Sequence, residues 1–444
     1  MNTPRLVLAG TNSGCGKTTV TCAILQALKD RGLHPAAFKC GPDYIDPMFH
    51  SRIIGAKSGN LDLFFFSENT ARYLLRKNSR GCDVSIIEGV MGFYDGLGLT
   101  TTAASTYEAA AVTDSPVVLI VNARGMSLSV LAQIQGFLTL YPDNHIRGVI
   151  LNRCSPMTYP ALAQAITRRF SLIMLGYLPE LPACSLESRH LGLVTADEVE
   201  DLQDRLGRLA VQAEKSLDLA ALLQLAASAP PLECTPVRLP RQEKPVRIAV
   251  ARDRAFCFYY EDSLDALREL GAELIPFSPL SDSKLPERIQ GLYLGGGYPE
   301  LYAAALSANS AMRRQIRSAL ERDLPCIAEC GGFMYLTQAI GDREMVGYLP
   351  GTCFDAGRLT RFGYVTLTDP QQPGLSLPAH EFHHWDCTAP GEAFQARKQS
   401  GRTWRCGYRN DHFYAGFPHF HFYACPDAAV RFYQACIKEG ERHA

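Results

Sequence analysis

A glycine-rich loop near the N-terminus sets the fold of the first part of this chain. The loop, Gly-Thr-Asn-Ser-Gly-Cys-Gly-Lys-Thr-Thr at residues 10–19, follows a short apolar run at residues 6–9 and leads into a helix-like stretch at residues 18–29. A strand, a glycine loop and a helix in this order form the phosphate-binding turn of nucleotide-binding α/β domains. The order therefore predicts a parallel α/β sheet with a phosphate site beside its first strand.

The residues of this loop have distinct chemical roles in binding a nucleoside triphosphate. Backbone N–H groups of small residues can surround phosphate oxygens, Lys17 can neutralise the β/γ charge, and the Thr18 hydroxyl can bind Mg²⁺. Thr11 stands where the strict pattern has glycine, and this variant resembles dethiobiotin synthetase and its relatives, which use ATP on small acids. The residues predicted to bind ATP are Asn12, Gly14, Cys15, Gly16, Lys17, Thr18 and Thr19.

Two acidic segments follow where metal ligands are expected. Residues 38–47 read Phe-Lys-Cys-Gly-Pro-Asp-Tyr-Ile-Asp-Pro, and residues 86–96 read Ile-Ile-Glu-Gly-Val-Met-Gly-Phe-Tyr-Asp-Gly. Carboxylates at the carboxyl ends of parallel strands lie near the phosphate loop, and Mg²⁺ prefers hard oxygen ligands. The carboxylates of these segments, Asp43, Asp46 and Glu88, are therefore the best-placed candidates for Mg²⁺ ligands.

The rhythm of the chain predicts two α/β domains in series. The N-terminal half alternates short β-branched runs with helix-like stretches, as a doubly wound parallel sheet does. Residues 226–244 are rich in Ala, Ser and Pro, and a second α/β rhythm begins at residue 246. The predicted organisation is a domain at 1–225, a linker at 226–244 and a domain at 245–444.

Composition narrows the partners and the compartment. The 444 residues carry 44 Lys and Arg against 45 Asp and Glu, so no strong field attracts nucleic acid or an anionic membrane. The sequence has no signal-peptide pattern and no apolar run long enough to span a bilayer. The fifteen cysteines include no Cys-x-x-Cys pair. We predict a cytoplasmic protein that acts on small molecules, and the sequence leaves open whether it forms a homo-oligomer.

A second chemical centre is predicted in the C-terminal half. Residues 324–336, Leu-Pro-Cys-Ile-Ala-Glu-Cys-Gly-Gly-Phe-Met-Tyr-Leu, read as a strand that turns sharply at Cys330 into a helix. Such a turn exposes a thiol, and the helix N-terminus favours its thiolate. His419 is the candidate base. The backbone N–H groups of the glycine loop at residues 295–297 and of Gly331 could form an oxyanion hole, and within the loop we predict that Gly297 donates.

These elements resemble a class I glutamine amidotransferase domain. Relatives with a full catalytic triad carry His-x-Glu where this chain has His419-Phe420-His421. The departure leaves Cys330 and His419 as a dyad, and the group that orients His419 is not evident from the sequence.

The segment His-Glu-Phe-His-His at residues 380–384 matches a zinc-protease pattern by letter only. That pattern requires a helix, whereas Pro378 precedes the segment and Asp386 and Pro390 follow it. We predict a loop here, and no zinc site.

Across nearly the whole chain, the motifs at residues 10–19, 38–47, 86–96 and 324–336 together resemble those of the cobyrinic acid a,c-diamide synthase family. The resemblance implies that ATP phosphorylates side-chain carboxylates a and c of cobyrinic acid during cobalamin synthesis. Ammonia that Cys330 releases from glutamine would then convert each one to an amide. It also implies that Asp43 and Glu88 help to hold Mg²⁺ with Thr18, and that Lys39, Tyr44 and Asp46 lie near the acceptor carboxylate.

Three alternatives stay open. The same reaction could use hydrogenobyrinic acid or nickel sirohydrochlorin as the acceptor. Cobyric acid synthase shares the architecture but lacks the Gly-Pro-Asp-Tyr and Val-Met-Gly-Phe-Tyr-Asp motifs. A P-loop ATPase switch with an inactive glutaminase-like domain is an alternative from another class, although such switches often carry a second lysine early in the loop, which is absent here.

Overall fold

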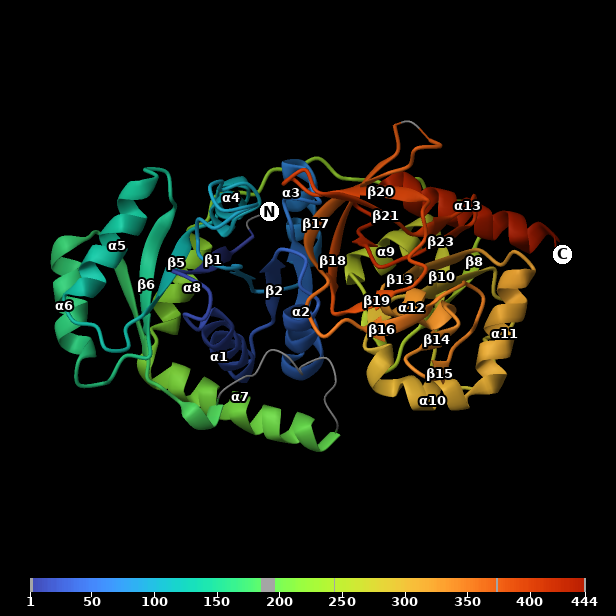
Figure 1. The fold of residues 1–444 in the computed structure, drawn as a ribbon. Helices are drawn as coiled ribbons and strands as arrows, with labels where there is room; N and C mark the ends of the chain where they lie inside the picture. Colours follow the sequence, from blue (N-terminus) through green and yellow to red (C-terminus); the bar gives the residue numbers. More distant parts are fainter. Residues whose placement is uncertain (1–2, 185–195, 243, 373, 443–444) are drawn as a thin grey trace. The chain divides into compact units, whose positions relative to one another are not determined.

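The chain folds into two compact units, Met1–Val237 and Arg238–Ala444, in the computed structural model (Figure 1). The structure describes residues 3–184, 196–242, 244–372 and 374–442. The predicted domain limits at 1–225, 226–244 and 245–444 remain a prediction; helix α8 extends into the predicted linker as far as Ala227. The parts of these predicted segments at 1–2, 185–195, 243, 373 and 443–444 lie outside the described residues.

The N-terminal unit is built on a seven-stranded sheet in the order β3-β2-β4-β1-β5-β6-β7, and every pairing in it is parallel. Its strands are β1 Arg5–Gly10, β2 Pro35–Cys40, β3 Lys57–Leu61, β4 Val84–Glu88, β5 Val117–Asn122, β6 Ile146–Asn152 and β7 Ile173–Leu178. Its helices are α1 Lys17–Asp30, α2 Ile45–Phe49, π-helix η1 His50–Ile54, α3 Glu68–Asn78, α4 Thr106–Val112, α5 Ser129–Leu140, α6 Tyr159–Arg169, 3-10 helix η2 Pro182–Cys184, α7 Ala196–Ser216 and α8 Leu219–Ala227.

Helices cover both faces of this sheet, because successive residues of a strand point to opposite sides. Leu6 and Leu8 of β1 pack in one core with α1, α7 and α8, whereas Val7 and Ala9 pack in another with α4, α5 and α6 (Figure 1). Both faces being buried explains why the strands read as continuous apolar runs. The predicted doubly wound parallel sheet is confirmed, and it places the carboxyl ends of β1, β2 and β4 side by side.

The C-terminal unit contains a six-stranded sheet in the order β10-β8-β11-β13-β23-β22, parallel except at β22, and a five-stranded antiparallel sheet in the order β21-β20-β17-β18-β24. Its strands are β8 Val246–Ala251, β9 Phe256–Phe258, β10 Ala272–Phe277, β11 Gly291–Leu294, β12 Gly296–Gly297, β13 Cys326–Glu329, β14 Ala339–Ile340, β15 Arg343–Glu344, β16 Thr352–Asp355, β17 Arg361–Thr368, β18 Ser376–His383, β19 Trp385–Cys387, β20 Phe394–Arg397, β21 Thr403–Cys406, β22 Tyr408–Arg409, β23 Phe413–Gly416 and β24 His419–Phe420. Its helices are α9 Glu261–Leu270, 3-10 helix η3 Pro299–Tyr302, α10 Ala303–Ala308, α11 Ser310–Glu321, α12 Gly331–Leu336 and α13 Pro426–Arg442.

The segment predicted as a loop around residues 380–384 is instead part of β18, so that prediction was wrong. Leu377, Ala379, Glu381 and His383 are all buried and recur at every second position, which is the period of a strand. β17 pairs with β18 along eight residues and holds the segment extended. The helix that a zinc-protease motif needs is therefore not formed at these residues.

Candidate functional site

The phosphate-binding loop turns tightly between β1 and α1. Gly14 and Gly16 have φ values of 77° and 97°, in the left-handed region that favours glycine. The side chain of Asn152, at the end of β6, donates a hydrogen bond to the carbonyl oxygen of Cys15 at 2.8 Å. A Cβ on Gly16 would lie 1.9 Å from Nδ2 of Asn152, so the contact depends on glycine at that position.

Replacing Gly16 with Ala is expected to lower the thermal unfolding midpoint more than replacing Gly14 with Ala. Either alanine costs roughly 1 kcal/mol in the left-handed region. Only Gly16→Ala also displaces Asn152, which adds about 1–2 kcal/mol for the lost hydrogen bond. Gly14→Ala is the matched control, since its Cβ would meet nothing within 4 Å. Equal shifts in calorimetry would show that the Asn152 contact contributes nothing.

Lys17 joins the phosphate loop to the segment after β4. Its ammonium donates to the carbonyl oxygens of Asn12 at 3.2 Å and Met91 at 2.5 Å, and its side chain is buried. Met91 has a φ of 49°, an uncommon conformation for this residue type, which turns its carbonyl toward the lysine. Burial lowers the pKa of Lys17. Lys17 is thus held at the edge of the sheet by two backbone oxygens.

Glu88 is the centre of the polar cluster beside this loop. Its Oε1 accepts hydrogen bonds from the Thr18 hydroxyl at 2.7 Å and from Lys39 Nζ at 2.8 Å, and its Oε2 lies 3.4 Å from Nε2 of His50. Glu88 is fully buried, which raises its pKa, but Lys39 and His50 outweigh burial and hold that pKa well below its usual range. Glu88 is therefore a carboxylate near neutral pH.

Asp43, Tyr44 and Asp46 follow Lys39 in the first acidic segment. Asp46 lies 2.5 Å from Lys39 Nζ, and burial raises the pKa of Asp46 to about 7 although Lys39 opposes the shift. Tyr44 is buried, and Asp43 accepts a hydrogen bond from the backbone N–H of Ile45 at 2.8 Å. The structure thus brings Lys39 and Asp46 to Glu88, and it fixes Asp43 in the turn that starts α2.

The donor set fits a hard divalent cation. Thr18 and Glu88 already touch, and within the described residues Glu88 Oε2 is a buried oxygen with no hydrogen-bond donor. An anionic oxygen beside a P-loop hydroxyl is the arrangement that a nucleotide-bound Mg²⁺ requires.

Cys330 lies at a sharp bend between β13 and α12. Its φ and ψ are 49° and −101°, a conformation rarely adopted by any residue except glycine. Such strain costs about 1–3 kcal/mol and is typical of functional positions. Its backbone N–H donates to the carbonyl oxygen of Gly416 at 2.7 Å, which ties the bend to the end of β23.

His419 follows β23 and meets the cysteine, because β13 and β23 are adjacent parallel strands with Glu329 opposite Gly416. The imidazole is buried, and a Cβ on Gly296 would lie 2.5 Å from its Cε1. Burial lowers the pKa of His419, but hydrogen bonding to Cys330 and Glu329 outweighs burial and raises it to about 10. This favours an imidazolium at His419 beside the Cys330 side chain.

The two glycines predicted to form the oxyanion hole are neighbours. A Cβ on Gly331 would lie 3.1 Å from the backbone N of Gly297, and Gly332 N–H donates to Gly295 O at 3.0 Å. Gly297 has a φ of 155°, and a side chain there would strike the backbone of Ala255. The triple-glycine loop can therefore lie directly against the first turn of α12.

Comparison with known proteins assigns the chain to a family. Residues 247–425 match the CobB/CobQ-like glutamine amidotransferase domain, and residues 6–194 match the CobQ/CobB/MinD/ParA nucleotide binding domain. Proteins named cobyrinate a,c-diamide synthase are similar over almost their whole length: 38% identical in Listeria innocua serovar 6a (97% of this chain, 99% of that protein) and 40% in Caldanaerobacter subterraneus subsp. tengcongensis (98% and 99%). The chain belongs to the cobyrinate a,c-diamide synthase family.

Membership in the cobyrinate a,c-diamide synthase family, with its amidotransferase domain, makes this chain a glutamine-dependent amide-forming ligase with a nucleotide-binding domain. A Salmonella typhimurium relative of the same name is 39% identical over 95% of both chains. Within the described residues, no helix is both long enough and apolar enough to cross a membrane.

Two residues near these sites were not found from the sequence. His50 begins the π-helix η1, and a lone histidine after a helical turn carries no recognisable pattern, although π-helical turns are frequent at functional sites. Glu329 directly precedes Cys330, and its spacing from the nucleophile could have identified it. Its carboxylate lies 3.5 Å from Nδ1 of His419.

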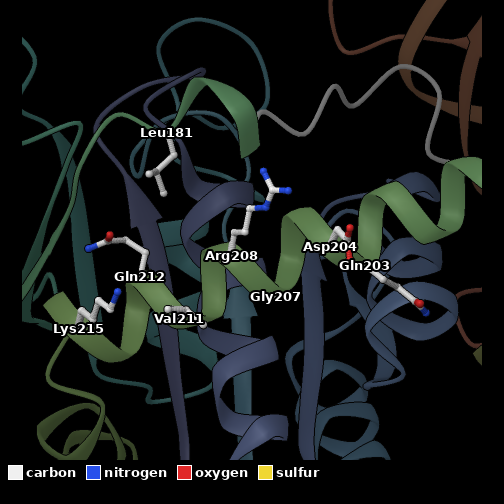
Figure 2. A pocket seen from close by; sticks show the side chains of 8 residues that line it. All are labelled: Leu181, Gln203, Asp204, Gly207, Arg208, Val211, Gln212 and Lys215. Atoms are coloured by element: carbon white, nitrogen blue, oxygen red, sulfur yellow. The ribbon is translucent and has the colours of Figure 1, made fainter.

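A separate hollow lies against helix α7 (Figure 2). It measures about 520 Å³ and is lined by Leu181, Gln203, Asp204, Gly207, Arg208, Val211, Gln212 and Lys215. No cysteine, histidine or predicted site residue lines it, so it belongs to neither site.

Proposed function

We propose that this protein uses ATP and glutamine to amidate the a and c side-chain carboxylates of cobyrinic acid in cobalamin biosynthesis. The names of the relatives support this acceptor. The observation that carries the reaction type is the presence in one chain of the Thr18–Glu88 contact beside Lys17 and of Cys330 beside His419. The first suits phosphoryl transfer from ATP, and the second suits hydrolysis of an amide.

The N-terminal unit activates the carboxylate. A carboxylate oxygen attacks the γ-phosphorus of ATP, and the bond from that phosphorus to the bridging oxygen breaks. The products are ADP and an acyl phosphate. Lys17 and the backbone N–H groups of the phosphate loop stabilise the negative charge on the phosphoryl group during its transfer. Asn12, Cys15 and Thr19 are part of this loop and bind ATP with it. Thr18, Glu88 and Asp43 would hold Mg²⁺, which would supply further charge neutralisation when bound.

The acceptor carboxylate binds close to Lys39 in this proposal. The ammonium of Lys39 already contacts the carboxylates of Glu88 and Asp46, and the acceptor carboxylate would be the third to pair with it. Tyr44 and Asp46 follow β2 at the same edge of the sheet and contact the rest of the side chain.

The C-terminal unit releases ammonia. The Cys330 thiolate attacks the glutamine carboxamide carbon, and the oxyanion binds the N–H groups of Gly297 and Gly331. His419 gives its proton to the departing nitrogen, the carbon–nitrogen bond breaks, and ammonia leaves. The acyl group stays on Cys330 as a thioester. Water then attacks the thioester with His419 as base, and glutamate leaves. Ammonia displaces phosphate from the acyl phosphate and forms the amide.

The product mass tests this proposal. Cobyrinic acid incubated with the protein, Mg-ATP and glutamine is expected to gain two carboxamide groups, as measured by mass spectrometry. Hydrogenobyrinic acid and nickel sirohydrochlorin are the comparison acceptors. Amidation of one of these, with cobyrinic acid unchanged, would replace the acceptor and keep the reaction. ATP hydrolysis without glutamate release from glutamine would instead favour a P-loop ATPase switch.

A further inference from the structure

Glu329 is a buried carboxylate that the proposed reaction does not yet use. It ends β13, immediately before Cys330, and its side chain is 2% exposed. Its Oε2 accepts a hydrogen bond from the Tyr293 hydroxyl at 3.1 Å and lies 3.5 Å from Nδ1 of His419. Its Oε1 accepts from the backbone N–H of Phe420 at 3.2 Å. The carboxylate thus faces donors from β11 and β24.

We propose that Glu329 is the positioning residue for His419, taking the part that a glutamate two residues after the histidine plays in full triads. This inference rests on the proposed glutaminase reaction. Nδ1 is the ring nitrogen of His419 that lies 3.5 Å from Glu329, so a proton on Nδ1 would face the carboxylate and leave Nε2 for Cys330 and the departing nitrogen of glutamine.

The electrostatics of the cluster support this role. A carboxylate with almost no access to water is costly unless donors or a cation compensate it. Tyr293 and Phe420 supply two hydrogen bonds, and an imidazolium at His419 supplies the charge. The pKa of His419 is consistent, since hydrogen bonds to Cys330 and Glu329 outweigh burial and raise it.

The residue at the usual triad position is engaged elsewhere. Nδ1 of His421 accepts a hydrogen bond from the backbone N–H of Tyr423 at 3.1 Å. The His421 ring packs against Tyr260 with the ring centroids 4.8 Å apart. These contacts fasten the end of β24 to the start of α9, and they leave Glu329 as the carboxylate beside His419.

A purely structural role is the competing explanation, because Glu329 also links β11 to β24. Glu329→Gln separates the two roles: the amide keeps the shape and an acceptor oxygen, but it removes the negative charge. We expect kcat for glutamate release to fall about 100-fold, with a smaller effect on KM for glutamine. Amidation with ammonium chloride should keep the wild-type rate.

The pH profile gives the decisive measurement. The raised pKa of His419 keeps the imidazolium present until the pH approaches that pKa, so the alkaline limb of kcat/KM for glutamate release reports its loss. Without the charge of Glu329 the pKa of His419 falls, and the limb should move to lower pH. Tyr293→Phe is the matched control: it removes one hydrogen bond from Glu329, keeps the charge, and should leave the limb in place.

Glu329→Asp retains the charge and should keep the wild-type alkaline limb even if kcat falls. A Gln variant with the wild-type limb and kcat would overturn the inference, as would equal losses in all three variants with unshifted limbs. Wild-type protein that released glutamate but left cobyrinic acid unchanged would overturn only the acceptor, since the Glu329 comparison needs glutamate release alone. Wild-type protein without glutamate release would overturn both.

Discussion

Replacing Cys330 with Ala is expected to reduce glutamine-dependent amidation by about a thousandfold or more while leaving ammonium-dependent amidation intact. In the proposed reaction the Cys330 thiolate is the nucleophile that forms the thioester, and an alanine side chain cannot form that bond. In the proposed reaction, carboxylate activation uses Lys17, Thr18 and Glu88 in the other unit, so externally added ammonia should still capture the acyl phosphate. Steady-state rates of ADP and amide formation, measured with each nitrogen donor, test both halves of the statement.

Cys326→Ala is the matched control for this variant. Cys326 begins the same strand, is fully buried, and has a thiol whose pKa burial raises. The Cys326→Ala variant creates a small cavity but keeps Cys330, so it should still use glutamine. Loss of both donor activities in Cys330→Ala would contradict a model in which the two chemistries occupy separate sites.

Replacing Lys17 with Ala is expected to lower amidation with either donor by about 100- to 1,000-fold, because phosphoryl transfer depends on charge stabilisation. The variant also loses the two hydrogen bonds from Nζ to Asn12 and Met91, which fix the phosphate loop against the segment after β4. ADP formation with cobyrinic acid and ammonium chloride measures the effect without any contribution from glutamine.

Lys29→Ala removes a lysine from the last turn of the same helix and serves as the control. It should support amidation at the wild-type rate with both donors. If Lys17→Ala retained ammonium-dependent amidation, the phosphate loop would not be the site of carboxylate activation, and the proposed division of labour would be wrong.

The sequence predicted the parts of the molecule in which chemistry and local structure coincide. The phosphate loop and the bend at Cys330 are each short strand–turn–helix segments, so their residues are adjacent along the chain and can be recognised together. The doubly wound sheet followed from alternating apolar runs. The structure then brought His419 to Cys330 through the pairing of β13 with β23.

Other features depend on contacts between distant segments and left no pattern in the sequence. His50, which follows β2, meets Glu88 at the end of β4 only in the folded chain, and the environment of Glu329 is created by Tyr293 and Phe420 from two other strands. β18 was predicted as a loop because proline and polar residues obscured its alternation. Its pairing with β17, rather than local preference, determines its conformation.

At position 330 the residue that best suits the backbone conformation differs from the residue that the proposed reaction needs. Glycine would relieve the positive φ and stabilise the C-terminal unit by about 1 kcal/mol, but it would abolish the nucleophile. A lineage that no longer needed glutamine would gain stability from that exchange, and nothing would select against it. A cysteine in this strained conformation fits a working nucleophile and gives no structural advantage to an inactive, glutaminase-like appendage.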